Sequence, residues 1–341
     1  MAAEAAEFSP EYAALVHLIN SRLSAGPLDI QILPDASFLL ESTLGEIINN
    51  TLGVPKAALA RAFLTARRIF FKYLDNLTEN AQVILDSTSI ILLFDPEHIT
   101  AANARKRICL AHRTLPQPEQ AKRLKEELWF NKFLVTSKLK RHNKSPTLWF
   151  HRKWLIENFH TVEGALSPKW AEYEVEEVIL ISAEHHPKNY YAWDYMRWVI
   201  KSRPGLDPRS SQGMNMQISH LMQKWCMAHT SDSSGWSFLA WMLLLHPNPD
   251  PRVSQNLQAN TGAEVLDFAL MMNLKNLSLW KFLQEILGFT NSEIIHDVRF
   301  EYLMNLSEMR GNLPPGSTLQ VFARKSLIAI GEYEGRPSIE R

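Results

Sequence analysis

The run KLKRHNK at residues 138–144 places four lysines or arginines and one histidine just before a predicted helix. Cations at the mouth of a pocket can attract an anionic substrate, and Lys144 is our candidate for such a contact. The same residues can instead end the preceding helix, where positive side chains complement the helix dipole. The sequence leaves both interpretations open.

A second group stands 44 residues further on, in HPKNYYAWDYMRWVI at residues 186–200. Lys188, Tyr190 and Tyr191 precede Trp193 at a predicted helix start. An ammonium and a phenol side by side can stabilise charge that develops on oxygen atoms during a reaction. The ordinary alternative is a solvated lysine in a turn.

Metal chemistry is not expected within this chain. The two cysteines, Cys109 and Cys226, lie 117 residues apart among apolar helical residues. His185 and His186 are adjacent at a predicted helix end, so their side chains point in different directions. We therefore predict no metal site, and we interpret both cysteines as buried free thiols.

Composition excludes several classes of protein. The 341 residues contain 36 Lys and Arg against 36 Asp and Glu. This balance argues against general binding to nucleic acids or membrane surfaces, although local patches remain compatible with it. The stretch MAAEAAEF has acid where a secretory signal has base, and no apolar run is long enough to span a membrane. We expect a cytoplasmic protein.

Apolar residues recur at helical spacing along nearly the whole chain, and sustained two-residue alternation is almost absent. An all-α fold is therefore predicted. Proline-bearing turns interrupt the helical pattern every 15 to 25 residues. Two polar stretches, 203–213 and 246–262, are interpreted as mobile loops rather than domain linkers. A short extended piece without evident chemistry is expected at GPLDIQILP, residues 26–34.

A repeat underlies these helices. Tryptophans open the phrases WFHRKW, WDYMRW, WSFLAW and WKFLQE at positions 149, 193, 236 and 280, with separations of 44, 43 and 44 residues. Ala102 occupies the same slot in an earlier, weaker copy. Each copy predicts two antiparallel helices that must stack on neighbouring copies to share a core, with the large indoles filling the seams.

The predicted organisation has three parts. A helical cap region occupies residues 1–79, five helical-hairpin repeats occupy 80–290, and a hairpin without the tryptophan phrase plus a tail occupies 291–341. Stacked hairpins of this kind form a solenoid whose ends have degenerate copies.

The phrases PKNYYAWDYMRWVI and SPTLWFHRKWLI resemble the repeat of protein prenyltransferase alpha subunits, whose usual wording is close to Asn-Tyr-x-x-Trp-x-x-Arg. The resemblance covers about residues 80–290 and marks the chain as a divergent member of that family. It implies a right-handed superhelical crescent of helical hairpins around a separate beta subunit. That partner carries zinc and most of the lipid pocket.

By the same resemblance, the heterodimer transfers an isoprenoid from its diphosphate to a cysteine near the C-terminus of an acceptor protein. We expect geranylgeranyl transfer rather than farnesyl transfer, and no activity from this chain alone. No cofactor is expected in the chain itself. The expected partners are the beta subunit, acceptor proteins and the isoprenoid diphosphate, without nucleic acid.

The resemblance also assigns roles to residues. Lys188 is expected to reach the departing diphosphate, and Tyr190 either donates to the same oxygens or packs in the seam. The expected substrate contacts are Lys144, Asn189, Tyr191 and Asp232. Positions expected to be structural or to meet the partner are Arg105, Trp149, Arg152 and Trp193, with a structural ion pair favoured for both arginines.

Two departures from the family pattern leave an alternative open. Pro146 stands where a tyrosine is usual, and Asp232 stands where asparagine is common. An acid at Asp232 would repel a peptide carboxylate, so acceptor preference can differ from that of the familiar enzymes. The alternative is a non-catalytic helical-repeat adaptor that binds another protein by its concave face.

Overall fold

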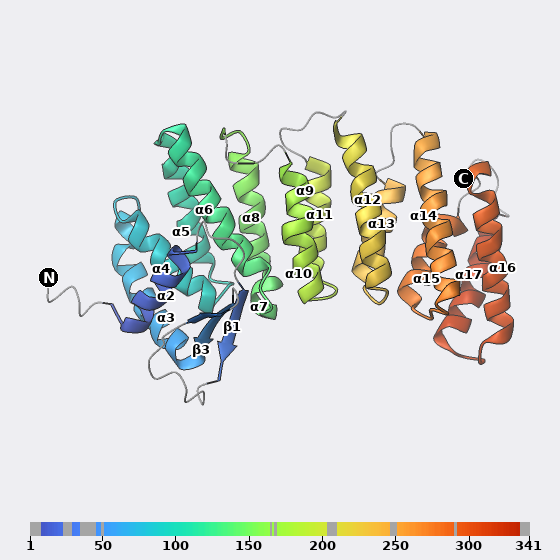
Figure 1. Ribbon diagram of the computed structural model, residues 1–341, viewed down its shortest axis with the longest axis horizontal. Helices are drawn as coiled ribbons and strands as arrows, with labels where there is room; N and C mark the ends of the chain where they lie inside the picture. Colours follow the sequence, from blue (N-terminus) through green and yellow to red (C-terminus); the bar gives the residue numbers. More distant parts are fainter. Residues whose placement is uncertain are drawn as a thin grey trace. The chain divides into compact units, whose positions relative to one another are not determined.

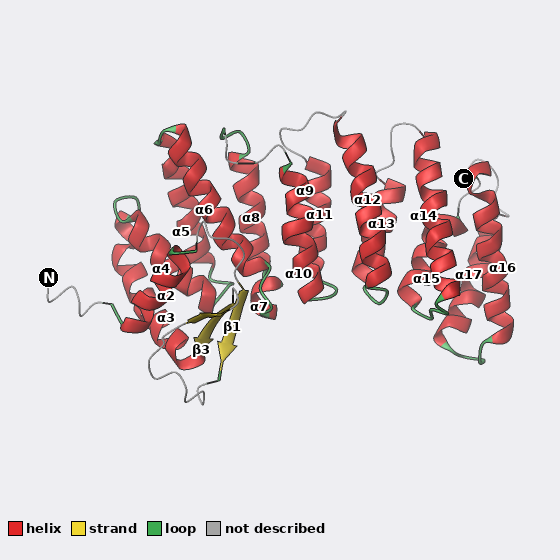
Figure 2. Cartoon of the chain, in the orientation of Figure 1, coloured by secondary structure: helices red, strands yellow, loops and turns green. Residues whose placement is uncertain are grey.

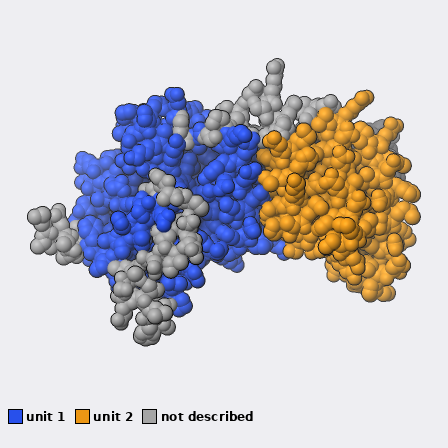
Figure 3. All heavy atoms as spheres, in the orientation of Figure 1, with its two compact units in different colours: residues 1–205 blue, residues 206–341 orange. Residues whose placement is uncertain are grey.

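The computed structural model describes residues 8–22, 29–34, 46–48, 51–163, 166, 169–202, 210–245, 251–289 and 292–334. The chain forms two compact units, residues 1–205 and 206–341 (Figure 3). The boundary falls inside the stretch 203–213, which the composition predicts to be a loop within the repeat array. The three-part organisation at residues 79 and 290 stays a prediction.

Unit 1 is built mainly from helices that pack side by side (Figure 1). Their bounds are α2 (Pro10–Asn20), α3 (Lys56–Tyr73), α4 (Ala81–Phe94), α5 (Ile99–Ala111), α6 (Gln117–Val135), α7 (Lys140–Asn143), α8 (Pro146–Phe159), α9 (Trp170–Glu174), α10 (Leu180–His185) and α11 (Tyr190–Ser202). A π-helical segment, Val175–Ile179, joins α9 to α10. Short 3-10 helices follow α3 at Leu74–Asn76 and α5 at His112–Thr114.

Unit 2 continues in the same manner. Its helices are α12 (Ser210–Ala228), α13 (Ser233–Leu245), α14 (Pro251–Met271), α15 (Leu277–Leu283), α16 (His296–Asn312) and α17 (Thr318–Glu334). A π-helical segment, Gln284–Gly288, extends α15, and the 3-10 helix Glu293–Ile295 leads into α16. The predicted all-α class is confirmed, because helix dominates the described residues (Figure 2). The superhelical crescent stays a prediction.

The tryptophan phrases start helices for a local reason. Trp149, Trp193, Trp236 and Trp280 each lie in the first turn of α8, α11, α13 and α15, and each is at most 3% exposed. Three of the indoles donate to the carbonyl six residues earlier: Trp149 to Asn143 (2.7 Å), Trp236 to Thr230 (3.0 Å) and Trp280 to Leu274 (3.0 Å). The indole therefore closes the turn that precedes its own helix.

The same indoles also fill the seams between successive hairpins. Trp149 lies 5.3 Å from the ring of Tyr195 on α11, and Trp236 lies 4.9 Å from Phe282 on α15. Trp280 stacks on Tyr302 of α16 at 6.4 Å. Each of these partners belongs to the next hairpin along the chain, so the aromatic repeat spacing translates directly into stacking of hairpins.

A small sheet was not predicted in full. Strand β1 (Asp29–Leu33) lies in the expected extended piece, but β2 (Glu46–Ile48) and β3 (Thr51–Pro55) do not follow from the sequence analysis. β3 is central, with β1 parallel and β2 antiparallel to it. Strands of three to five residues are too short to show a clear two-residue alternation.

The loop predicted at 246–262 is wrong for residues 251–262, which form the first turns of α14. Likewise, residues 210–213 begin α12, whereas 203–209 and 246–250 lie outside the described residues. The polar side chains that favoured a loop are used in packing. Gln258 is buried and donates to the carbonyl of Ile286, and Gly262 lies so close to Leu287 that a Cβ would come within 2.8 Å of it.

Among the residues that the structure describes, no helix combines the length and the apolar character needed to cross a bilayer.

Candidate functional site

The candidate lysines lie on neighbouring turns of unit 1. Lys144 ends α7, and its Nζ donates to the carbonyl of Pro187 (3.0 Å) in the turn before α11. Lys188 follows Pro187 directly, is exposed, and adopts a left-handed backbone with φ of 58°. That conformation costs a lysine about 1–2 kcal/mol. The structure thus brings the two turns together and holds Lys188 in a strained one.

Asn189 joins these turns from within. Its side chain is fully buried, and its Nδ2 donates to the carbonyl oxygen of Asn143 (3.0 Å), to Asn143 Oδ1 (2.5 Å) and to Ser182 Oγ (3.0 Å). The Asn189 carboxamide therefore faces the protein interior, where it connects the residue after Lys188 to Asn143 and Ser182. This geometry makes it a positioning group rather than a group presented to a substrate.

The two tyrosines that follow are placed differently from Asn189. Tyr190 is the first residue of α11, and 67% of its surface is exposed. Tyr191 is half-buried, and its ring meets Tyr190 edge to face at 5.5 Å. An exposed phenol two residues from an exposed ammonium is available for an anionic ligand.

The basic run 138–144 is largely occupied by contacts with earlier segments. Lys138 pairs with Asp29 of β1 (3.0 Å), and Arg141 lies 3.7 Å from Asp95. His142 is buried, with Nε2 2.8 Å from the carbonyl of Leu93 at the end of α4. Burial lowers the pKa of His142 to about 4, so this imidazole is neutral at pH 7.

The adjacent histidines have separate partners. His185 Nδ1 lies 2.7 Å from the carbonyl of Thr136, whereas His186 Nε2 lies 2.8 Å from the carbonyl of Lys138. Both rings thus bond the backbone just after α6 and do not converge. Over the described part of the chain, no three histidine, cysteine or acidic side chains gather in a way that could hold a metal ion.

Asp232 and Pro146 have local structural explanations. Asp232 is 2% exposed, and its Oδ1 accepts from the amides of Ser234 (2.9 Å) and Gly235 (3.1 Å) at the start of α13. Aspartate and asparagine are comparable helix N-caps, so this departure from the family pattern preserves the cap. Pro146 is the first residue of α8, where its missing amide hydrogen is not needed.

The arginines three residues after the repeat position form buried ion pairs. Arg105 Nη2 lies 2.6 Å from Glu127 Oε2, and Arg152 Nη2 lies 2.6 Å from Glu174 Oε1. All four side chains are at most 4% exposed. In both pairs the Nε of the arginine also donates to the second carboxylate oxygen, at 2.8 Å for Arg105 and 2.6 Å for Arg152. The geometry is therefore bidentate.

Two further groups extend these pairs. His151 Nε2 lies 2.7 Å from Glu127 Oε1, and the Tyr195 hydroxyl donates to Glu174 Oε2 at 2.8 Å. Burial alone would raise the pKa of Glu127, but the charge of Arg105 and the hydrogen bonds from His151 and Arg105 hold it well below its ordinary value. Burial also raises the pKa of Tyr195, and the charge of Glu174 adds to this effect.

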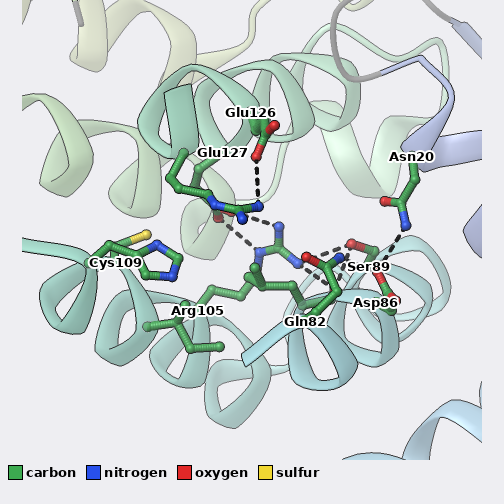
Figure 4. A pocket seen from close by; sticks show the side chains of 12 residues that line it. Asn20, Gln82, Asp86, Ser89, Arg105, Cys109, Glu126 and Glu127 are labelled. Carbon is green, nitrogen blue, oxygen red and sulfur yellow. Dashed lines mark hydrogen bonds and ion pairs between the residues drawn. The ribbon is translucent and has the colours of Figure 1, made fainter. Parts of the chain in front are cut away.

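A polar pocket of about 220 Å³ lies beside the first of these pairs (Figure 4). Its lining side chains bind one another: Asp86 accepts from Asn20 (3.0 Å) and Gln82 (2.8 Å), and Arg123 pairs with Glu126 (3.3 Å). Cys109 borders this pocket, and burial raises the pKa of its thiol. The thiol is therefore a poor nucleophile at neutral pH.

Sequence analysis missed the acidic partners of the two arginines. Glu127 and Glu174 each lie 22 residues after their arginine, so the equal spacing was a usable signal. The tryptophan phrases mark the second helix of each repeat, whereas Glu127 and Glu174 lie on first helices, α6 and α9. Ser182 was missed as well, since a serine inside a helix gives no indication of a contact with the next turn.

Comparisons with known proteins match part of the repeat region. The protein prenyltransferase alpha subunit repeat matches residues 133–159, and the ECM9 middle domain matches residues 148–264. Protein prenyltransferase alpha subunit repeat-containing protein 1 is 26% identical over 171 residues in Homo sapiens, covering 46% of this chain and 38% of that protein. The Danio rerio protein of that name is 24% identical over 173 residues, covering 45% and 36%.

A second group of relatives carries an enzyme name. Geranylgeranyl transferase type-2 subunit alpha of Mus musculus is 32% identical over 117 residues, which is 34% of this chain and 18% of that protein. The chain therefore matches well under half the length of each of these relatives. The two segments matched by family models, 133–159 and 148–264, contain Trp149, Trp193 and Trp236. Over part of its length the chain is therefore similar to protein prenyltransferase alpha subunit repeat proteins.

Proposed function

We propose that this chain is an alpha-type subunit of a cytoplasmic heterodimeric protein prenyltransferase, active only with a beta subunit. The observation that carries the proposal is the turn before α11. There Lys188 is exposed in a strained conformation beside the exposed Tyr190, and Lys144 stands on the adjoining turn. Strained backbone is often found at functional sites, where surrounding structure maintains it.

The chemistry assigned to this turn is stabilisation of a leaving group. When the isoprenoid carbon separates from its diphosphate, negative charge develops on the phosphate oxygens. We assign to the Lys188 ammonium and the Tyr190 hydroxyl the role of donating hydrogen bonds to those oxygens. The acceptor cysteine has to react as a thiolate, which a metal ion stabilises. Because the described donor groups here do not converge, we place the zinc on the partner.

A surface for that partner adjoins the turn. The N-terminal parts of α5, α8 and α11 each expose one large apolar side chain, Ile99 (64%), Phe150 (59%) and Tyr190 (67%). α8 packs against both α5 and α11, so the three lie on neighbouring helices. Exposed apolar side chains on adjacent helices favour a protein interface. The names of the enzyme relatives support geranylgeranyl as the transferred group.

Coexpression with candidate beta subunits tests the proposal. We expect a stable heterodimer that transfers labelled geranylgeranyl to a protein with a cysteine near its C-terminus. Lys188→Asn should slow transfer while leaving the heterodimer intact, because asparagine tolerates the left-handed backbone but carries no charge. Lys122→Asn, on the exposed face of α6, is the matched control and should have no effect.

A non-catalytic adaptor is the second candidate. It is favoured by Lys144, whose ammonium is bonded to the Pro187 carbonyl, and by the buried cap at Asp232. These are two of the four positions expected to contact substrates, and both have a structural explanation. An adaptor would form a stable complex without transfer activity, whichever lipid diphosphate is supplied. Heterodimer formation with equal transfer rates for the parent and Lys188→Asn would instead remove Lys188 from the proposed catalytic role.

A further inference from the structure

Helix α3 carries a concentration of positive charge that the neutral chain does not predict. Its 18 residues contain five cations, Lys56, Arg61, Arg67, Arg68 and Lys72, and no acidic residue. The sequence has no acid from Ile47 to Leu74. Among the neighbouring acids, Glu11 of α2 pairs with Arg61 (2.6 Å), and exposed Asp75 follows the helix. A local basic surface therefore exists in a protein of zero net charge.

The exposed face of α3 also has an apolar centre. Leu64 is 65% exposed and Phe71 is 48% exposed, although the opposite face buries Ala62, Ala66 and Ile69. At 3.6 residues per turn, positions 64 and 71 lie within about 20° of each other around the helix axis. Leu64 and Phe71, two turns apart, therefore form an apolar ridge along the outer side of the helix.

The cations flank this ridge on both sides. Arg67 lies on one side of the line through Leu64 and Phe71, and Arg68 and Lys72 lie on the other. Arg67 also covers the ring of Phe71, with its guanidinium carbon 5.5 Å from the centroid. In Figure 1, α3 is the light-blue helix next to α2 and α4, and its packing partners leave the outer face open to solvent.

We propose that this face of α3 docks on an anionic phospholipid bilayer. An apolar ridge between two rows of cations suits the interface, because the ridge enters the acyl boundary while long cationic side chains reach lipid phosphates. A protein partner would need a groove to receive Leu64 and Phe71 together, with acids on both rims. A fluid bilayer accepts a convex helix without such complementarity. The proposal does not depend on the prenyltransferase assignment.

Vesicle sedimentation with the full chain tests this docking. We expect binding to vesicles of phosphatidylserine and phosphatidylcholine at about 0.1 M salt, little binding to pure phosphatidylcholine, and weakening as salt rises. Arg67→Glu with Arg68→Glu should lower the partition coefficient at least tenfold. Leu64→Ser with Phe71→Ser should lower it to a similar extent.

Matched controls separate docking from general charge or hydrophobicity. Lys122→Glu with Lys125→Glu makes the same change in net charge on α6, and Val321→Ser with Ile328→Ser removes an exposed apolar pair of the same spacing on α17. Both controls should bind like the parent, and all variants should keep the parent's circular dichroism. Absence of parental binding, equal losses in the controls, or binding to polyglutamate but not to vesicles would overturn the proposal.

Discussion

The buried pair Arg152–Glu174 allows a quantitative test of how the repeats are held together. Arg152 is 1% exposed and Glu174 is 3% exposed, with both contacts between guanidinium and carboxylate at 2.6 Å. Replacing Arg152 by Met preserves much of the volume but leaves the Glu174 carboxylate buried without its cation, accepting a hydrogen bond from the Tyr195 hydroxyl. Removing one member of such a pair costs about 3–5 kcal/mol of unfolding free energy.

The double replacement Arg152→Met with Glu174→Leu should be less harmful than either single one. It removes both charges, so no uncompensated ion remains. The carbonyl of Leu128 (3.0 Å) and Asn131 Oδ1 (3.4 Å) would still lose their arginine donor. Leaving such acceptors unsatisfied costs about 1–3 kcal/mol. We therefore expect a total loss of about 1–2 kcal/mol for the double variant.

Urea unfolding at pH 7, followed by circular dichroism, measures these losses. Since the chain has two compact units, the curves are fitted for two transitions, and the one that moves belongs to unit 1. The reasoning is refuted if the single losses simply add in the double variant, or if Arg152→Met costs under about 1 kcal/mol, the value typical of an exposed pair.

Three further predictions use the same preparation. Lys188→Asn should leave the free energy of unfolding unchanged or raise it by up to about 1 kcal/mol, because asparagine relieves the left-handed strain. A clear loss of stability would contradict this. Trp193→Ala should cost about 3–5 kcal/mol, since the indole is 1% exposed, and an unchanged melting temperature would contradict its place in the seam. His142 has its folded pKa lowered to about 4 from 6.5, so its contribution is present above pH 6.5 and is lost as pH falls toward 4. Between pH 7 and pH 5 this contribution to the free energy of unfolding changes by roughly 2 kcal/mol. His142→Gln keeps a donor for the Leu93 carbonyl and should reduce the pH dependence of stability by that amount. An equal pH dependence in both proteins would refute the assignment.

The tryptophan register could be predicted because it depends on local geometry. An indole in the first turn reaches the carbonyl six residues earlier, so its position marks a helix start wherever it occurs. Four positions before Trp149 and Trp236, the side chains of Ser145 and Asp232 cap the helix. These relations involve fewer than ten residues, and sequence spacing expresses them directly.

The parts that sequence did not predict depend on contacts between distant segments. Whether Lys144 faces solvent or a carbonyl is decided by Pro187, 43 residues later. The first turns of α14 have a polar composition typical of loops, and Gln258 is stabilised there by a carbonyl of the next helix. Strand β1 is stabilised partly by the ion pair between Asp29 and Lys138. Local composition contains no information about such partners.

The ion pairs show which positions of a repeat are constrained and which are available for chemistry. In two copies an arginine stands three residues after the repeat position, with its glutamate 22 residues later. In the next copy these positions hold Met196 and Ile218, so charge is absent from both, and both residues are buried. A buried charge without its partner is costly, whereas a buried apolar side chain needs no such partner. The core positions therefore have to change together, while Lys144 and Lys188, on turns outside this core, can differ without that constraint. The ends of the hairpins are accordingly where a function distinct from packing can be placed.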